Sequence, residues 1–319
     1  MASALRRTKQ TLVPSLLALC YICAACDGGT LTPVAPSAAL SSDIGLVQSV
    51  SAQWSPYVGV HVTGQALDTY RDAIASLQAR GRLRGVRIEI SPTLNPNDPV
   101  VRNINSAGVE VLALIGNEYL FAENIELEID NIFANFPWIR YFQIGNEVTS
   151  ILPPTGPTLN ITQYMSVFQR IYAHVQNHHG NRVTLLTQSP LGTGAHGPME
   201  LEAMVANGLA NMNPDNIIIA INAYDLDSAV QYLGLLGSSL RKYRIWITES
   251  GVRDPDLHIS WVRDNYPRLR NLLRAERVYW YTMWGGDNGP DTDFSLVKNP
   301  GHYPNYWRSP LFEVLTASP

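Results

Sequence analysis

Cysteine and charge are both scarce in this sequence. Among 319 residues there are three cysteines, Cys20, Cys23 and Cys26, and all of them lie near the N-terminus. The chain after Cys26 therefore has no internal disulfide and no cysteine-based metal site. Charged residues make up 16%, and Lys+Arg 23 against Asp+Glu 27 leaves a formal net charge of -4. This balance gives no positive field for holding a nucleic-acid backbone or an anionic bilayer, so nucleic-acid binding is not expected.

Long hydrophobic runs are also missing after residue 26. A membrane-spanning helix needs roughly 20 apolar residues, and no stretch there approaches that length. With 45% hydrophobic residues, the chain nevertheless has the composition of a globular protein with a sizeable core. Its length suits one large α/β domain or two small ones.

The first 25 residues have the three zones of a secretory signal peptide. Basic Arg6 and Lys9 precede an apolar run that is too short for a comfortable membrane span, and the small residues Ala24 and Ala25 end it. We therefore expect an exported protein and exclude residues 1–25 from the fold.

Cys26 follows these small residues, and this arrangement resembles the signal of bacterial lipoproteins, whose cysteine is lipidated and becomes the mature N-terminus. The resemblance implies a cell-envelope lipoprotein with a membrane anchor at Cys26, while plain secretion and a retained anchor stay open as alternatives. Residues 26–55 are rich in Gly, Pro, Ser, Thr and Ala without a sustained period. We expect them to form a tether between the anchor and the folded domain.

Eight short apolar runs, rich in β-branched residues, follow the tether. Such nearly continuous runs are typical of parallel strands that are buried on both faces. The eight runs are 57–62, 86–90, 109–115, 141–144, 183–187, 217–221, 245–248 and 278–283.

Segments with helical patterning separate these runs, at 66–78, 123–133, 161–176, 201–209, 229–240 and 259–273. Strand and helix recur about every 32 residues, the length of a βα unit. Eight units over residues 56–319 predict an α/β fold, a (β/α)8 TIM barrel that forms a single catalytic domain. An open doubly wound sheet is the competing fold, but the turn after the first run, Val62-Thr63-Gly64-Gln65, lacks its Gly-rich signature.

Carboxylates follow two of the predicted strands. The fourth run leads into Gly145-Asn146-Glu147, and the seventh leads into Thr248-Glu249. Chemistry in such barrels sits at the C-terminal ends of the strands. Strands four and seven lie three places apart in a ring of eight, so both side chains can converge over the barrel mouth. Two convergent carboxylates are what retaining glycoside hydrolysis requires.

Asn146-Glu147 and Thr248-Glu249 at these two strands resemble glycoside hydrolase clan A, the barrel superfamily with carboxylates on strands four and seven. The resemblance covers the chain from residue 57 onward. It implies retaining hydrolysis of a β-linked glycan, with Glu147 as general acid/base and Glu249 as nucleophile. It further implies that Asn146 binds the sugar hydroxyl next to the anomeric carbon, and that no metal or organic cofactor takes part.

The resemblance also extends to supporting residues. It implies that Arg87 lies beneath the nucleophile and keeps it ionised, that Tyr224 hydrogen-bonds the same carboxylate, and that Trp284 forms an aromatic platform under the sugar. Asn222 stands where several families of the clan have His, and Val148 follows Glu147 where Pro is frequent. These two departures leave the family within the clan, and hence the substrate, open.

A second Ile-Gly-Asn-Glu sequence ends the third run at Glu118 and is an alternative acid/base. Its partner would be Asp225 after the sixth run, and Glu249 would then be unexplained, so we expect Glu118 at the rim of the cleft. His61 and His196, near the ends of strands one and five, are candidates for lining the cleft.

Two further segments carry functional hypotheses. His178-His179 suggests a metal site, but adjacent residues at a helix end point in different directions and no third ligand is near in sequence, so we predict a solvated helix terminus. The segment 285–306 is a long loop after strand eight that we expect to shape or cover the substrate groove.

The sequence therefore predicts a monomeric retaining glycosidase whose partner is a carbohydrate. Two alternatives use the same barrel. A transglycosylase would employ the same residues with a sugar acceptor in place of water, and a non-catalytic carbohydrate-binding barrel would have lost turnover.

Overall fold

A computed structural model describes most of the chain after the predicted tether. The described residues are 58–62, 75–76, 84–92, 94–97, 101–102, 104, 109–149, 158–192, 194–286, 291–298 and 307–316. The predicted signal peptide, the tether and nearly all of the predicted helix 66–78 lie outside them. Within these ranges, no helix is long and apolar enough to cross a membrane.

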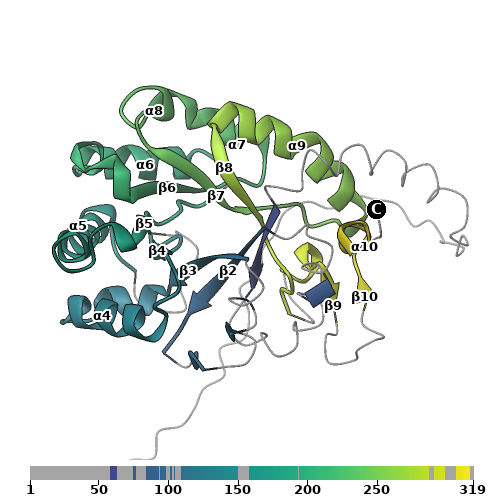
Figure 1. The fold of residues 1–319 in the computed structure, drawn as a ribbon. Coiled ribbons are helices and arrows are strands. Elements are labelled where there is room, and N and C mark those ends of the chain that lie inside the picture. The colour runs from purple at the N-terminus through teal and green to yellow at the C-terminus, as the bar shows by residue number, and fades with distance from the viewer. Residues whose placement is uncertain are drawn as a thin grey trace, which may run out of the picture. The chain divides into compact units, whose positions relative to one another are not determined.

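Eight parallel strands close into a barrel in chain order, with β1 paired to both β2 and β8 (Figure 1). This arrangement confirms the predicted TIM barrel. The strands are β1 (Val58–Val62), β2 (Gly85–Ile90), β3 (Glu110–Ile115), β4 (Tyr141–Ile144), β5 (Thr184–Leu186), β6 (Ile217–Asn222), β7 (Arg244–Ser250) and β8 (Ala275–Trp280).

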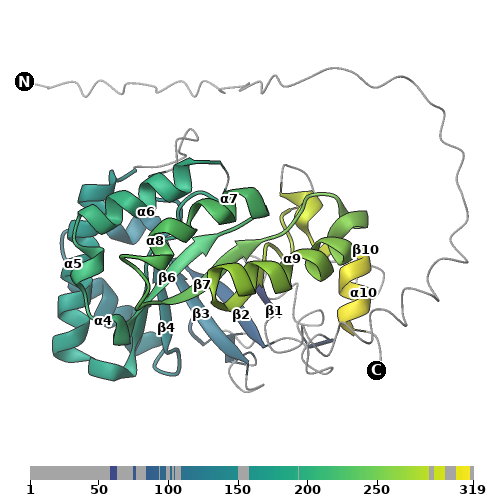
Figure 2. The same cartoon turned by 90° about the horizontal axis from the view of Figure 1, so that it is seen from above.

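Helices follow the strands and lie outside the barrel (Figures 1 and 2). The α-helices are α4 (Ile125–Asn135), α5 (Ile161–His178), α6 (His196–Ala206), α7 (Leu226–Gln231), α8 (Leu233–Gly237), α9 (His258–Leu273) and α10 (Pro310–Thr316). Short 3-10 helices are η2 (Asn117–Phe121), η3 (Gly180–Arg182), η4 (Leu209–Asn211), η5 (Pro214–Asn216), η6 (Pro255–Leu257) and η7 (Thr292–Phe294). Two short strands, β9 (Val297–Lys298) and β10 (Trp307–Arg308), pair antiparallel after the barrel.

Two predicted elements differ from the structure. The predicted helix 229–240 is two helices, α7 and α8, and α7 begins early because the Asp225 side chain accepts the backbone N–H of Ser228. The predicted strand 278–283 is β8, which ends at Trp280. The apolar run continues to buried Met283, but there the backbone N–H bonds to the carbonyl of His61 instead of continuing the ladder with β7.

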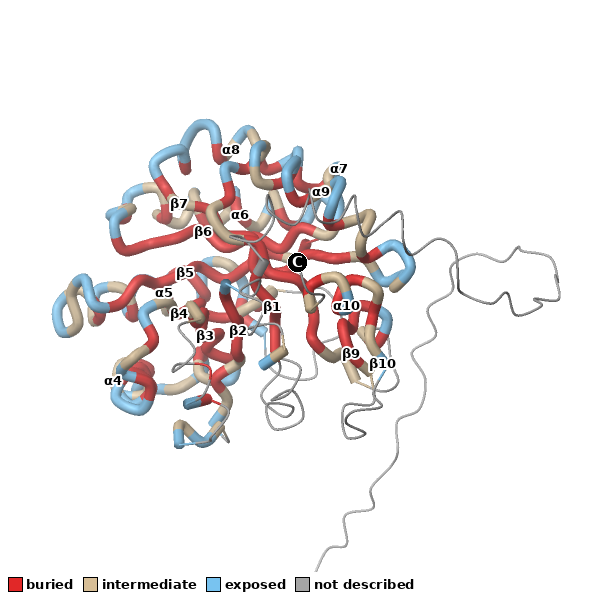
Figure 3. Tube along the Cα trace, turned by 45° about the vertical axis from the view of Figure 1, so that its right-hand side comes forward, coloured by how far each residue is buried: buried red, intermediate tan, exposed pale blue. Residues whose placement is uncertain are grey.

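Alternation along the strands separates an outer from an inner face. On β2, Val86, Ile88 and Ile90 belong to the large core outside the barrel, whereas Arg87 and Glu89 point inward. Figure 3 shows the strands buried and the outer turns of the helices exposed.

The lower interior of the barrel is apolar. Six buried side chains form one cluster there: Leu112, Leu186, Ile218, Ala220, Trp246 and Tyr279. The cluster separates two polar groups inside the barrel: the polar side chains at the C-terminal ends of the strands, and Arg244, Arg277 and Glu110 at the N-terminal ends, where both arginines lie over the Trp246 ring.

Candidate active site

A cavity of about 680 Å³ lies at the C-terminal ends of the strands and has the size of a small-molecule site. Its lining combines residues from all eight barrel strands or the segments that follow them. The described lining residues are His61, Arg87, Glu89, Leu114, Gly116, Asn117, Glu118, Asn146, Glu147, Leu191, Tyr224, Glu249, Arg253, Tyr281, Asp291 and Phe294.

Glu249 is a buried carboxylate that receives a donor on each oxygen. Arg87 Nη1 donates to Oε1 at 2.8 Å, and the Tyr224 hydroxyl donates to Oε2 at 2.5 Å. Burial, followed by the charge of Glu249, raises the pKa of Tyr224 well above its ordinary value, so this phenol stays protonated and acts as a donor. A cation and a phenol O–H both favour the ionised carboxylate.

Arg87 is 0% exposed, and its guanidinium is satisfied by several acceptors. Besides Glu249, it donates to Gln143 Oε1 at 2.9 Å and to Asn146 Oδ1 at 3.1 Å. Its Nη1 also lies 3.1 Å from His61 Nδ1. Such a buried cation is tolerated because it is paired and hydrogen-bonded.

His61 is neutral in this arrangement. Burial first, and the positive charge of Arg87 second, lower the pKa of His61 well below its ordinary value. Because a guanidinium only donates, Nδ1 must be the acceptor and the ring proton resides on Nε2. The ring stacks on Tyr281 with centroids 5.4 Å apart, which joins the ends of β1 and β8.

The turn after β4 directs Glu147 into the cavity. Gly145 has φ +74°, and a Cβ there would meet Val148 Cγ1 at 2.6 Å, so the turn requires glycine. Glu147 itself has φ +48°, and its backbone N–H donates to the carbonyl of Ser189 at 2.9 Å. A non-glycine residue in this conformation is held by its surroundings at a cost of about 1–3 kcal/mol.

Glu147 has the opposite electrostatic surroundings to Glu249. Its Oε1 accepts a hydrogen bond from the neutral Asn222 amide at 2.9 Å. Burial, and then the negative charge of Glu249, raise the pKa of Glu147 from 4.5 to about 7. A carboxyl group with this pKa can hold a proton near neutral pH and release it in the same pH range.

Asn146 links the two carboxylates. Its Oδ1 accepts from Arg87 at 3.1 Å and lies 3.4 Å from Nδ2 of Asn222, which also binds Glu147. The backbone of Asn146 is held by two hydrogen bonds of 2.9 Å with the Asn117 side chain. With its oxygen directed at Arg87, the amide turns its NH2 group away from the guanidinium.

The Asn222 amide is oriented from beneath. Thr248 Oγ1 donates to Asn222 Oδ1 at 3.0 Å, so the amide nitrogen is the atom that faces Glu147. Thr248 also hydrogen-bonds with Ser189. Thr248 and Ser189 are both fully buried, which fixes the position of this donor.

The structure brings most of the predicted site residues together. Glu147, Glu249, Asn146, Arg87, Tyr224 and His61 line one cavity, and Asn222 contacts Glu147 directly. Their assigned roles stay predictions. Glu118 also lines this cavity, as expected of a rim residue, from η2.

Trp284 and His196 lie elsewhere. Trp284 is half-buried against the hydrophobic core and is not among the described residues lining the cavity. Tyr281 occupies this part of the wall, with its hydroxyl 3.2 Å from Asp291 Oδ2. His196 is exposed at the start of α6.

Sequence reasoning did not identify several of the lining residues. Strand alternation could have identified Glu89, because it lies two positions after Arg87 and therefore shares the inner face of β2. Burial, and then the charge of Glu118, raise its pKa. Arg253 and Asp291 come from loops, and Phe294 is the last residue of η7. The last two belong to the segment 285–306, so its described part does contribute to the wall of the cavity.

Comparisons with known proteins give independent support for the fold. No protein-family model matches this chain, and no curated protein matches it either. A β-mannanase from Thermomonospora fusca, in a mannotriose complex, is 16% identical with a TM-score of 0.54, over 82% of this chain and 89% of that chain.

Two further solved structures are similar. An endo-β-1,3-glucanase of family GH128 (subgroup II) from Sorangium cellulosum is 14% identical, with a TM-score of 0.52 over 82% of this chain and 98% of that chain. A GH5 xyloglucan-specific endo-β-1,4-glucanase from a metagenomic library, in complex with cellotriose, is 13% identical. Its TM-score is 0.52, over 86% of this chain and 99% of that chain. At these identities the likeness establishes the TIM-barrel fold.

Proposed function

We propose that this chain is a retaining glycoside hydrolase that cleaves a β-linked glycan by double displacement. The observation that carries the proposal is the pair of cavity-lining carboxylates at the ends of β4 and β7 with opposite surroundings. Glu249 has Arg87 and Tyr224 on its two oxygens, whereas the pKa of Glu147 is raised to about 7. One carboxylate is thus prepared as a nucleophile and the other as a proton donor.

In the first step, ionised Glu249 attacks the anomeric carbon while the bond to the leaving oxygen breaks. Glu147 gives its proton to that oxygen, so the leaving sugar departs as a neutral alcohol. The product is a glycosyl ester on Glu249 and an ionised Glu147.

In the second step, Glu147 acts as a base. The ester has removed the negative charge of Glu249, which is the second largest cause of the raised pKa of Glu147. The pKa of Glu147 therefore falls when the intermediate forms, and the carboxylate is ready to take a proton from water. That water attacks the anomeric carbon, the ester bond breaks, and the sugar leaves with retained configuration.

The substrate class rests on the fold and the cavity together. The similar structures are described as a β-mannanase and β-glucanases, which supports a β-linked glycan here. Asn146 has its amide oriented by Arg87 for contact with a sugar hydroxyl, and Tyr281 offers an aromatic face in the wall where Trp284 was expected. The mechanism uses no metal or organic cofactor.

Export belongs to the same proposal, because polymeric glycans are met outside the cell. The signal-like residues 1–25 and Cys26 support a lipid-anchored or secreted enzyme. Mass spectrometry of the N-terminal peptide tests this: an acyl group on Cys26 supports the anchor, and an unmodified peptide starting at Asp27 or later indicates plain secretion.

The experiment for activity is a screen of the purified protein against β-glucans, mannans, galactans and xylans, with anomeric configuration followed by NMR. We expect hydrolysis of at least one substrate with retention, lost in both Glu147→Gln and Glu249→Gln. Inverted products would contradict the double displacement. Longer glycans would indicate the transglycosylase, and binding without cleavage would indicate a carbohydrate-binding barrel.

A further inference from the structure

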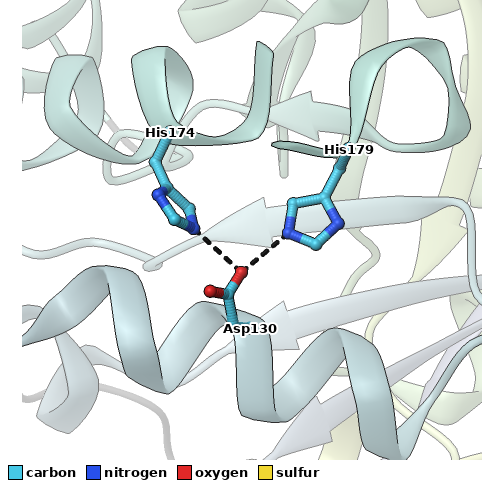
Figure 4. A group of neighbouring side chains, drawn as sticks. All are labelled: Asp130, His174 and His179. Atoms are coloured by element: carbon cyan, nitrogen blue, oxygen red, sulfur yellow. Dashed lines mark hydrogen bonds and ion pairs between the residues drawn. The ribbon is translucent and has the colours of Figure 1, made fainter. Parts of the chain in front are cut away.

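A second polar cluster lies on the outside of the barrel, between α4 and α5 (Figure 4). Asp130 projects from α4, His174 from α5, and His179 directly follows the end of α5. Both imidazole Nε2 atoms lie on the same carboxylate oxygen, Asp130 Oδ1, at 2.8 Å for His174 and 2.7 Å for His179. None of the three residues lines the cavity of the proposed active site.

The end of α5 explains why His179 joins this cluster and His178 does not. His179 is the C-cap, with φ -120° and ψ -18°, and its N–H bonds to the carbonyl of Val175. Its ring packs edge-on against the buried Phe133 of α4, with centroids 4.9 Å apart. Adjacent histidines therefore diverge, as their positions predict. The prediction that no further ligand is near in sequence is wrong, because His174 lies five positions before His179 on α5, and Asp130 comes from the neighbouring α4.

The three donor atoms form a set suited to a transition-metal ion. Two imidazole nitrogens and one carboxylate oxygen lie within 4.8 Å of one another. A tetrahedral zinc ion with bonds of about 2.0–2.1 Å keeps its ligand atoms about 3.3 Å apart, so the carboxylate needs to withdraw by about half an ångström. The side chains are 15%, 16% and 43% exposed for His174, His179 and Asp130, which admits an ion and a water ligand from solvent.

We propose that Asp130, His174 and His179 form a binding site for Zn²⁺ or a similar divalent transition metal, and that the ion links α4 to α5. Imidazole ligands favour such metals over Ca²⁺ and Mg²⁺, which prefer oxygen. The site is structural because it lies apart from the cavity. It rests on its own geometry and does not depend on the proposed glycosidase activity.

The ion replaces two hydrogen bonds. Without metal, each imidazole donates Nε2–H to Asp130, since an ionised carboxylate only accepts. With metal, the Nε2 lone pairs bind the ion and each remaining ring proton sits on Nδ1. At His179 this requires Arg182 to move, because its Nη2 lies 3.1 Å from Nδ1. Arg182 is exposed, so it can move without disturbing the core. Arg170 is paired with Glu126, and this ion pair does not need to change.

The test is a calorimetric titration of the full chain, purified without a histidine tag, with Zn²⁺ at neutral pH. We expect one ion per chain at the cluster, with binding weakened at least about tenfold in Asp130→Asn and in His174→Gln, because each removes one of three ligands. His178→Gln is the matched control. Its ring lies beside His174, with centroids 4.5 Å apart, yet it is outside the ligand set and should leave affinity unchanged.

The wild type and the three variants all contain Cys20, Cys23 and Cys26. Any zinc that these cysteines bind is therefore the same in all four titrations and cancels in the comparison. Circular dichroism in EDTA checks folding, and Asp130→Asn carries the test if a histidine variant unfolds, because the amide oxygen still accepts both imidazole hydrogen bonds. Equal affinity in all four proteins, or an equal loss in His178→Gln, would overturn the site. A crystal soaked in Zn²⁺ should show an anomalous peak between Asp130 and His174. If zinc occupies other sites in that crystal fully and no peak appears at the cluster, the proposed site is also overturned.

Discussion

The two sides of the cavity hold the same residue type in opposite environments. On the β7 side, Glu249 accepts from a buried guanidinium and a phenol, and both donors favour the ionised carboxylate. On the β4 side, Glu147 accepts from the neutral Asn222 amide, and burial with the charge of Glu249 raises its pKa to about 7. The difference teaches that neighbouring residues can prepare two glutamates for the two different roles that we propose.

The two sides are also connected. Asn146 Oδ1 binds Arg87 of the Glu249 side and lies within 3.4 Å of Asn222 of the Glu147 side. The negative charge of Glu249 is itself a cause of the raised pKa of Glu147. A change in the charge of Glu249 should therefore change the pKa of Glu147.

Replacing either glutamate by glutamine should have the largest effect. Glu147→Gln removes the proton donor and Glu249→Gln removes the nucleophile, so each should reduce kcat on a natural glycan about 1,000-fold or more. Glu118→Gln is the matched control at the cavity rim and should lose far less. A loss in Glu118→Gln as large as that in Glu147→Gln would transfer the acid/base to the end of β3.

The same two variants should differ in stability. Glu249→Gln leaves the buried guanidinium of Arg87 without its counter-charge, and we expect the free energy of unfolding to fall by about 3 kcal/mol. Glu147→Gln resembles the protonated form that dominates below the pKa of about 7, so it should change stability by less than about 1 kcal/mol. Denaturant unfolding below pH 7 measures both, and equal losses would remove the contrast between the two sides.

Arg87→Met should lower kcat/KM. Glu249 then loses the guanidinium that donates to its Oε1 at 2.8 Å, so we expect kcat to fall about tenfold or more. Arg253→Met is the control, since Arg253 lines the cavity but lies over the Phe294 ring. An unchanged kcat/KM in folded Arg87→Met would make Arg87 a purely structural residue.

Asn222→Ala should have the smallest effect. The Asn222 hydrogen bond lowers the pKa of Glu147 against the two raising causes, so its removal should move the basic limb to higher pH by less than about one unit. A basic limb that moves to lower pH would mean that another group controls it.

Much of this arrangement could be predicted from sequence, because parallel strands buried on both faces leave a clear apolar period. Once eight strands are counted, geometry alone places the residues that end β4 and β7 at one mouth. The apolar pattern predicts the strand end wrongly where an apolar run continues beyond the hydrogen bonds between strands. Met283 is buried in a loop, so the apolar run is typical of a strand as far as residue 283, and the aromatic residue that lines the cavity directly after β8 is Tyr281.

Contacts between residues that are far apart in sequence on neighbouring helices were also not predicted. Asp130 lies 44 positions before His174, and only the packing of α4 against α5 brings them together. Asp291 and Phe294 reach the cavity from a loop whose path carries no sequence period. Arg87 was found through a resemblance, and its inward direction follows from the alternation of β2.

The most direct test of the contrast between the two glutamates uses an activated aryl β-glycoside, whose leaving group needs no proton. Glu147→Ala should still form the glycosyl-enzyme and stall, and added azide should then restore turnover and give a β-glycosyl azide. Glu249→Ala should not form that intermediate, and azide should give the α-glycosyl azide if it reacts. The same response in both variants, or the reverse assignment of the two azide products, would contradict the account.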